Sequence, residues 1–286
     1  MMADSQVSVG GALRFAWALL SQNWRAIWGA LALNALAWTV LVAGLLAGNG
    51  DLLLGGWLGV LMTKYPLYGA VIRASDAKAK AKTQASAPAP THLGLQWRAP
   101  ELRMLGADAL FSIFQLIMGM LVAIALLAPV IGVFMRSGVD PAKLTTPQEV
   151  MARLGPHGPA IMQGESLAFW IILTALALRL SLALVASAES GRVVLLSTWR
   201  LTRGQFWRLA GASLMVNLPL IVALAVTGAV TPLGTSQAVT PGEIFSYALL
   251  TGVLAGAATT PLMAGVQLYF YRRLGPVPER AERGAA

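Results

Sequence analysis

Three ionisable residues lie inside long apolar stretches of the sequence, and these residues could carry chemistry. Lys64, Asp108 and Arg179 each stand in a run of predominantly apolar residues. A charge inside a bilayer costs several kcal/mol unless it is paired, so such a residue commonly marks a ligand site, a transport route or an ion pair between helices. Measured at about 1.5 Å per helical residue from the nearest cytoplasmic-side charge, the three would lie about 13 Å, 8 Å and 15 Å deep. Their head groups could therefore meet in the inner leaflet.

Two interpretations of these three residues stay open. In the first, Asp108 pairs with Arg179 or Lys64, and the remaining cation binds an anionic headgroup or a phosphate. In the second, an ion pair fixes the second, third and fourth membrane helices together, and the remaining side chain extends to the interface. Buried ion pairs often specify packing and nothing else, which favours the second interpretation.

A further cluster of cations lies in the segment STWRLTRGQFWRL at residues 197–209. It contains three arginines and three aromatic residues: Arg200, Arg203, Arg208, Trp199, Phe206 and Trp207. These residue types could form a nucleic-acid surface, a catalytic anion site or the cytoplasmic foot of a membrane helix. Trp concentrates at the headgroup level and Arg at the cytoplasmic surface, where anionic lipids lie, which favours the third possibility. The arginines do not share one helical stripe, so we expect two short helices that meet at Gly204.

The composition decides the class of protein that must position these residues. Of 286 residues, 57% are hydrophobic and only 12% are charged, and the mean hydropathy is +0.67. A soluble domain would have too little polar surface to cover itself. Six apolar blocks are long enough to cross a bilayer, at about residues 27–47, 52–73, 105–135, 166–188, 209–230 and 244–271. The sequence therefore predicts an all-α polytopic membrane protein with about six transmembrane helices.

The distribution of the basic residues predicts the orientation of the chain. If alternate connecting segments are cytoplasmic, 16 of the 21 Lys and Arg residues lie on that side, 3 on the other and 2 within the blocks. By the positive-inside rule, both termini are expected in the cytoplasm of a bacterial cell, with the chain in the inner membrane. No nucleic-acid partner is expected, because no nucleic-acid-binding motif accompanies the net charge of +9.

The chain is predicted to repeat a helical hairpin three times. The segments NWRAIWGALAL (23–33), ELRMLGADAL (101–110) and FWRLAGASLM (206–215) each place an arginine shortly before Gly-Ala. The first hairpin would occupy residues 1–76, a flexible cytoplasmic linker 77–92, the second hairpin 93–189 with an outward loop at 137–165, and the third hairpin 190–286 with a basic C-terminal tail. In each hairpin, the outgoing membrane helix is expected to follow a cytoplasmic pre-helix that lies along the interface and stops at an elbow, at 21–23, 99–101 or 203–205.

Polar residues recur at matching depth in the outgoing helices. Asn34, Ser112 and Asn217 each follow an arginine by nine residues, and Gln115 and Gln267 add to this set. Such residues usually form hydrogen bonds between helices, and a polar path is the alternative. Near the end of the fourth block, Glu189 and Arg192 are expected to form a solvated i, i+3 pair.

Enzymatic activity finds little support in the sequence. There is no cysteine, and the two histidines, His92 and His157, lie in predicted loops on opposite sides of the membrane. No metalloprotease helix, nucleophile elbow or phosphate-binding glycine loop is present. We therefore expect no catalytic residue, no metal site and no cofactor.

The segment from Ser197 to Arg208 resembles the "SW-R-L-x-x-G-x-F-W-x-L" segment of bacterial membrane proteins of the glycerophosphoryl diester phosphodiesterase membrane-domain type. Residues 269–273, which read YFYRR, are similar to the closing Tyr-Arg cluster of that family. The resemblance implies an architecture of about six helices. In fused members the phosphodiesterase activity belongs to a separate soluble domain, so the resemblance transfers no catalytic residue.

Together these features predict a non-catalytic integral membrane protein with a lipid-interacting or scaffolding role. Membrane lipids, especially anionic ones, are the expected partners, held by Arg200, Arg203 and Arg208. The alternative is a transporter of a small anionic solute or a lipid through an inner-leaflet pocket at Lys64, Asp108 and Arg179.

Overall fold

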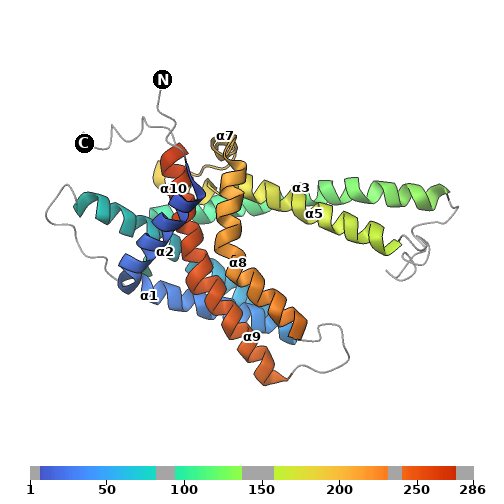
Figure 1. The fold of residues 1–286 in the computed structure, drawn as a ribbon, viewed down its shortest axis with the longest axis horizontal. Helices are drawn as coiled ribbons and strands as arrows, with labels where there is room; N and C mark the ends of the chain where they lie inside the picture. Colours follow the sequence, from blue (N-terminus) through green and yellow to red (C-terminus); the bar gives the residue numbers. More distant parts are fainter. Residues whose placement is uncertain (1–6, 82–93, 137–157, 231–239, 275–286) are drawn as a thin grey trace. The chain divides into compact units, whose positions relative to one another are not determined.

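The computed structural model describes residues 7–81, 94–136, 158–230 and 240–274, and these residues form helices and short connections without a β-strand (Figure 1). The elements are α1 (Val9–Ala47), α2 (Gly50–Ala81), α3 (Ala99–Arg136), α5 (Gly158–Leu180), α6 (Ala183–Ser190), α7 (Ser197–Leu201), α8 (Phe206–Val230), α9 (Pro241–Val253), the π-helix η4 (Leu254–Thr259) and α10 (Thr260–Leu274). Most of the predicted linker, residues 137–157 of the outward loop, both histidines and the C-terminal tail lie outside the described residues.

Five helical segments of the described chain are long and apolar enough to cross a membrane. They are Val9–Ala47, Ala99–Ala128, Gln163–Ser190, Phe206–Ala225 and Pro241–Leu274. The predicted all-helical fold is therefore confirmed for the described residues, and the five long apolar helices are compatible with the predicted membrane class. The second predicted block, residues 52–73, is also helical and lies in α2, but it is not among the five. Its glycines and the neighbouring residues Lys64, Tyr65 and Pro66 make this stretch less hydrophobic than the others.

The described residues divide into two bodies, each with its own contacts. The larger contains residues 1–107 and 181–286, and the smaller contains residues 108–180. In the smaller body, α3 and α5 pack together where α3 has a glycine: a β-carbon at Gly119 would lie 3.8 Å from the side chain of Leu173 and 3.9 Å from Phe169. The outward-facing residues of this helix pair are large and apolar, such as Leu116 and Ile124, as expected of helices that contact lipid.

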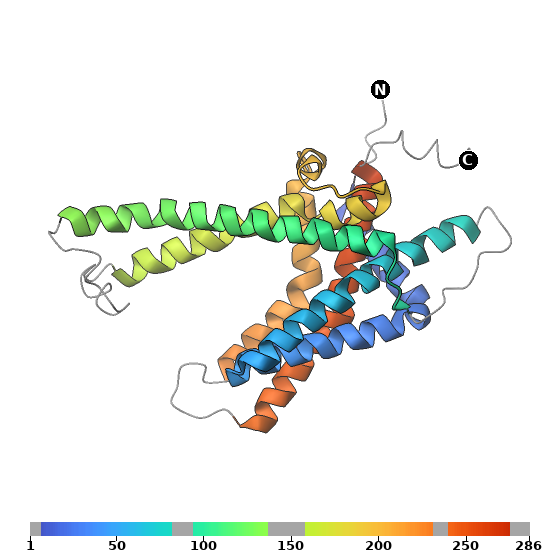
Figure 2. The ribbon, with the colours of Figure 1, turned by 180° about the vertical axis from the view of Figure 1, so that it is seen from behind.

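The core of the larger body is built on α1 and α2, which run antiparallel and side by side (Figures 1 and 2). The turn between them places Gly48 in the left-handed region, with φ of 62°, where glycine is favoured because it lacks a β-carbon. The side chain of Asn49 then accepts hydrogen bonds from the backbone N–H groups of Asp51 and Leu52, both 3.1 Å long, and so caps the start of α2. Further along the pair, Gly56 lies directly against the backbone of Leu41.

Helix α1 packs on α10 and η4 at two points, and the spacing of those points shows that α1 bends. Ala16 contacts Gly265, and Ala35 contacts Gly256. Ala16 and Ala35 are nineteen positions apart and would be about 28 Å apart along a straight helix, whereas Gly256 and Gly265 are nine positions apart, or about 13 Å. The middle of α1 must therefore leave the partner helix and return, and its dark blue start and lighter remainder point in different directions in Figures 1 and 2.

The predicted elbow at residues 21–23 is wrong as a helix end, because α1 is helical through it. The two polar residues that suggested an N-cap instead bond back into the preceding turn. Asn23 donates to the carbonyl of Leu19 over 2.8 Å, and Ser21 donates to the carbonyl of Ala18 over 3.4 Å. Side chains that bond to carbonyls three or four residues earlier leave a helix continuous and often bend it.

The other two elbows differ from each other. At the second, α3 begins at Ala99 with Pro100 in its first turn, as predicted, but residues 95–98 before it are not helical, so the pre-helix expected there is wrong for these residues. At the third, α7 ends at Leu201 and α8 begins at Phe206. Gly204 between them has φ of 81°. The predicted break at this glycine is confirmed, but only one of the two helices is short, because α7 has 5 residues and α8 has 25.

Candidate functional site

One end of the larger body gathers the start of α1, the end of α2, the start of α3, the end of α6, all of α7, the start of α8 and the end of α10. Val9 lies 3.7 Å from the position of a β-carbon on Gly211, and the side chain of Tyr269 lies against Gly11. These contacts bring both ends of the larger body's helical chain to the place where α7 and α8 meet (Figure 1). We call this region the basic end.

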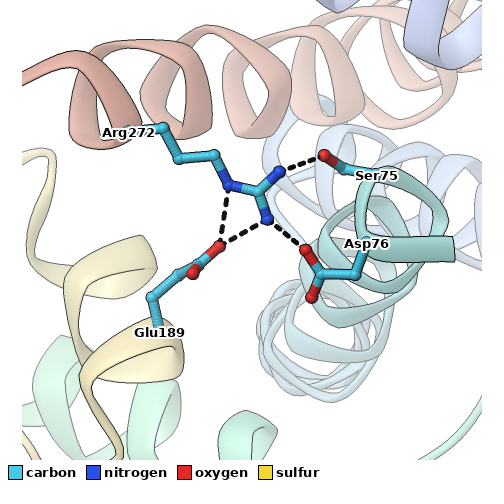
Figure 3. Close-up of polar contacts among 4 residues, drawn as sticks. All are labelled: Ser75, Asp76, Glu189 and Arg272. Atoms are coloured by element: carbon cyan, nitrogen blue, oxygen red, sulfur yellow. Dashed lines mark hydrogen bonds and ion pairs between the residues drawn. The ribbon is translucent and has the colours of Figure 1, made fainter. Parts of the chain in front are cut away.

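Arg272 of α10 binds three residues at the basic end, from α2 and α6 (Figure 3). Its Nε and Nη2 atoms donate to the same oxygen of Glu189, over 3.1 Å and 2.7 Å. The two Nη atoms also bind the hydroxyl of Ser75 and the carboxylate of Asp76. One guanidinium therefore joins three helices. Of the charged side chains in this cluster, Asp76 is the most exposed to solvent, and about half of its surface is accessible.

The predicted pairing of Glu189 with Arg192 is wrong, because Glu189 binds Arg272 instead. Gly191, which ends α6 with φ of 75°, turns the chain immediately before Arg192. The turn leaves Arg192 exposed to solvent, while Glu189 stays on the side of α6 that faces α10.

A second ion pair at this end joins α2 to α3. The Glu101 side chain is fully buried and binds Arg73 through one carboxylate oxygen. Its other oxygen accepts the backbone N–H of Arg98 over 2.9 Å, which caps the first turn of α3. The chain passes close to this carboxylate at Gly69, where a β-carbon would collide with Glu101. Both carboxylate oxygens are thus occupied, so this pair serves packing.

The arginines of the α7–α8 connection differ from these internal pairs because they face outward. Arg200, Arg203 and Arg208 are all exposed. Arg208 donates to the side-chain oxygen of Gln205 over 3.1 Å, and no acidic residue occurs between positions 190 and 230. The cations of the ion pairs described at this end are Arg73 and Arg272, not the three outward arginines. The three outward arginines are therefore a concentrated positive charge without an acidic neighbour in their own segment.

Two tryptophans accompany the outward arginines, one on each side of the Gly204 turn. Trp207, at the start of α8, is 83% exposed, and Trp199 in α7 is 40% exposed. The backbone that carries them is fixed by buried threonines. Thr198 donates to the carbonyl of Leu195 over 2.6 Å, and Thr202 donates to that of Trp199 over 3.1 Å. We call Trp199, Arg200, Arg203, Trp207 and Arg208 the arginine–tryptophan rim.

The residues of the predicted inner-leaflet pocket lie in different bodies. Lys64 belongs to the larger body, in α2, and its Nζ lies 5.5 Å from the centre of the Tyr65 ring. Asp108 and Arg179 belong to the smaller body, and both are partly buried. The pocket that would combine all three stays a prediction.

Of the recurring polar residues, Asn34 joins helices of the larger body. Its amide donates to the carbonyl of Gly256 in η4 over 2.9 Å, and its side-chain oxygen accepts the Thr63 hydroxyl of α2 over 2.9 Å. Asn217 instead donates to the carbonyl of Ser213 in its own helix, over 2.7 Å. Asn34 therefore behaves as an interhelical hydrogen-bonding residue, whereas Asn217 does not act in the same way despite its matching sequence position.

Ser112 and Gln115 lie in the smaller body, where Ser112 is exposed and Gln115 is partly buried. Gln267 is buried in the larger body, and its side-chain oxygen has no hydrogen-bond partner among the described residues. Within the parts of the chain that the structure covers, no group of three or more His, Asp or Glu residues is placed to hold a metal ion.

Comparisons of the chain with protein-family models, with curated proteins and with solved structures found no match.

Proposed function

We propose that this chain is a non-catalytic integral membrane protein that holds anionic lipid headgroups at its arginine–tryptophan rim, in a lipid-interacting or scaffolding role. The observation that carries the proposal is the outward exposure of Arg200, Arg203 and Arg208 at the start of a membrane-length helix, with no acidic residue in the same segment. A free positive surface at that position meets the phosphate layer of a bilayer.

The physical chemistry of the rim supports this assignment. Trp207 exposes most of its ring at the first turn of α8, and an indole has an apolar body with a polar N–H, which suits the headgroup level. Each Arg or Lys near an anionic membrane surface contributes about 1 kcal/mol of attraction. Arginine also binds phosphate oxygens through two parallel N–H groups, which lysine does not do.

The number of membrane helices, their arrangement as hairpins and the orientation of the chain are part of the same proposal. We count α2 as a sixth membrane helix, so that α1 and α2, α3 and α5, and α8 with α9–α10 form three hairpins. Both termini are proposed to lie in the cytoplasm, and the chain in the bacterial inner membrane, because Lys and Arg concentrate on one side of this arrangement. An assignment to the glycerophosphoryl diester phosphodiesterase membrane-domain type is likewise a proposal, which rests on residues 197–208 and 269–273.

The test compares the lipids that purify with the wild-type protein and with the triple variant R200Q/R203Q/R208Q. With about 1 kcal/mol lost per arginine, the ratio of anionic to zwitterionic lipid retained should fall at least about fivefold. The matched control is R200K/R203K/R208K, which keeps the charge and should retain most of the anionic lipid. An unchanged ratio in the glutamine variant, with the fold intact by circular dichroism, would contradict the proposal.

A further inference from the structure

The first half of α1 carries another surface of arginine and tryptophan, separate in sequence from the rim. At 100° per residue, six of its positions fall within a stripe about 100° wide: Arg14, Trp17, Ser21, Trp24, Arg25 and Trp28. All six side chains are exposed, and the tryptophan exposures are 64%, 52% and 49% for Trp17, Trp24 and Trp28. Three exposed tryptophans on one helical stripe need an environment that favours indole.

Packing on the opposite face fixes this stripe outward. Ala12, Ala16, Leu19 and Ile27 are buried, and they belong to the two apolar clusters of the larger body, where they meet α2, α8 and α10. These positions lie about half a turn away from the stripe around α1. The helix therefore cannot rotate to cover its tryptophans without exposing its core face.

The exposed residue types change along α1 between Trp28 and Leu33. From Leu33 onward, the large exposed side chains are leucines, such as Leu33, Leu36 and Leu45, which suit the hydrocarbon layer. Up to Trp28 they are tryptophans and arginines, which suit the headgroup layer. Helix α1 therefore begins with the surface of an interfacial helix and continues with the surface of a membrane-spanning helix.

The charge on the stripe is entirely positive. Arg14 and Arg25 lie on one edge of the stripe and the tryptophans on the other. No acidic residue occurs between positions 7 and 50. The Arg25 guanidinium lies 5.6 Å from the centre of the Trp24 ring, which keeps the cation beside an indole without neutralising its charge. A partner that fits must present negative charge next to a partly apolar layer.

We propose that residues 14–28 of α1 form an interfacial arm that binds anionic phospholipids, with Arg14 and Arg25 on the lipid phosphates and the three tryptophans at the glycerol level. The inference rests on the proposed membrane location, but it does not depend on the arginine–tryptophan rim. The bend, which lies between Ala16 and Ala35, then has a role: it lets the start of α1 lie along the headgroup layer while the end of the helix crosses the hydrocarbon.

The experiment measures quenching of Trp24 fluorescence by brominated lipids in nanodiscs that contain the full-length chain. Trp24 is kept and the other eight tryptophans are changed to Phe. The brominated lipid is either phosphatidylglycerol or phosphatidylcholine at equal molar fraction, with bromines near the glycerol end or near the methyl end of the acyl chains. We expect quenching to be strongest with bromines near the glycerol end, and at least about twofold stronger with the anionic lipid.

The added change R14Q/R25Q should abolish the preference for the anionic lipid, while R14K/R25K should keep it. The matched control keeps Trp170 alone, an exposed tryptophan of α5 in a segment without nearby basic residues, and it should show no lipid preference. R200Q/R203Q/R208Q should leave the Trp24 preference intact, so failure of the rim and failure of the arm are distinguishable. Equal quenching by the two lipids, strongest quenching from the methyl end, or no quenching at all would each overturn the proposal.

Discussion

Arg272 of α10 holds Glu189 of α6 through two nitrogen atoms that share one carboxylate oxygen, at 2.7 Å and 3.1 Å. The same guanidinium reaches Ser75 and Asp76 of α2 (Figure 3). Three helices that are distant in sequence therefore depend on one side chain. The charges of this cluster face inward, and those of the rim face outward. This difference separates the arginines that hold the fold from those that we propose to bind lipid.

Replacing Arg272 should destabilise the basic end more than replacing its neighbour Arg273. In R272M, Glu189 and Asp76 lose their shared cation. We expect the free energy of unfolding to fall by about 1 to 3 kcal/mol, because the carboxylates are only partly exposed. Arg273 is exposed and lies over the Tyr269 ring, so R273M should cost less than about 1 kcal/mol. Thermal unfolding in detergent would measure both, and equal losses would contradict the structural role of Arg272. Adding E189Q to R272M should recover part of the loss.

Asn34 and Asn217 have equivalent sequence positions, yet they should differ in their contribution to stability. Asn34→Leu removes hydrogen bonds to two other helical segments, η4 and α2, and leaves the buried carbonyl of Gly256 without this donor. We expect the free energy of unfolding to fall by about 1 to 2 kcal/mol. Asn217→Leu removes a bond within its own helix and should cost less. If the two variants unfold at the same temperature, Asn34 does not join the helices as described.

A methyl group at Gly69 should disrupt the ion pair between α2 and α3. Gly69→Ala places a β-carbon on the buried Glu101 carboxylate, so the ion-paired side chains of Glu101 and Arg73, or the helices that carry them, must move. We expect the free energy of unfolding to fall by about 1 to 3 kcal/mol. Gly55→Ala is the matched control, because it lies in the same helix and its β-carbon would meet no atom within 4 Å. It should be neutral or slightly stabilising. Equal behaviour of the two variants would show that α2 and α3 do not pack closely at Gly69.

The three ionisable residues within the apolar stretches allow a prediction that separates packing from ligand binding. If Asp108 and Arg179 form an architectural pair, Arg179→Leu alone should lower the yield of folded protein, because it leaves a carboxylate in an apolar setting. The double variant D108N/R179L should then restore the yield and any cellular phenotype. Restored folding with a persistent loss of a bound phospholipid or phosphorylated metabolite, scored by native mass spectrometry, would instead support the inner-leaflet pocket.

Local features of the fold could be predicted from the sequence, whereas pairings between distant segments could not. The break at Gly204 follows from a residue that tolerates positive φ between two segments rich in arginine and aromatic residues. The break expected at Ser21 and Asn23 failed because the same side chains that cap a helix start can also bond back into a continuing helix.

The same distinction between local features and distant pairings applies to the candidate site. Arg200, Arg203 and Arg208 could be selected as exposed cations because Trp and Arg crowd into one short segment. The ion pair of Arg272 with Glu189 spans 83 residues of sequence, and no local pattern specifies it. The stripe on α1 has a signal in the sequence, the helical spacing of Arg14, Trp17 and Trp24, but it becomes distinctive only once the opposite face is known to be buried.

The most direct measurement of the central claim is native mass spectrometry of the protein released from nanodiscs that contain equal amounts of phosphatidylglycerol and phosphatidylcholine. The number and class of bound lipids would be scored for the wild type, R200Q/R203Q/R208Q and R200K/R203K/R208K. We predict that the wild type and the lysine variant retain phosphatidylglycerol preferentially, and that the glutamine variant loses this preference while its fold is unchanged. The same lipid distribution on all three proteins would contradict a lipid-binding role for the arginine–tryptophan rim.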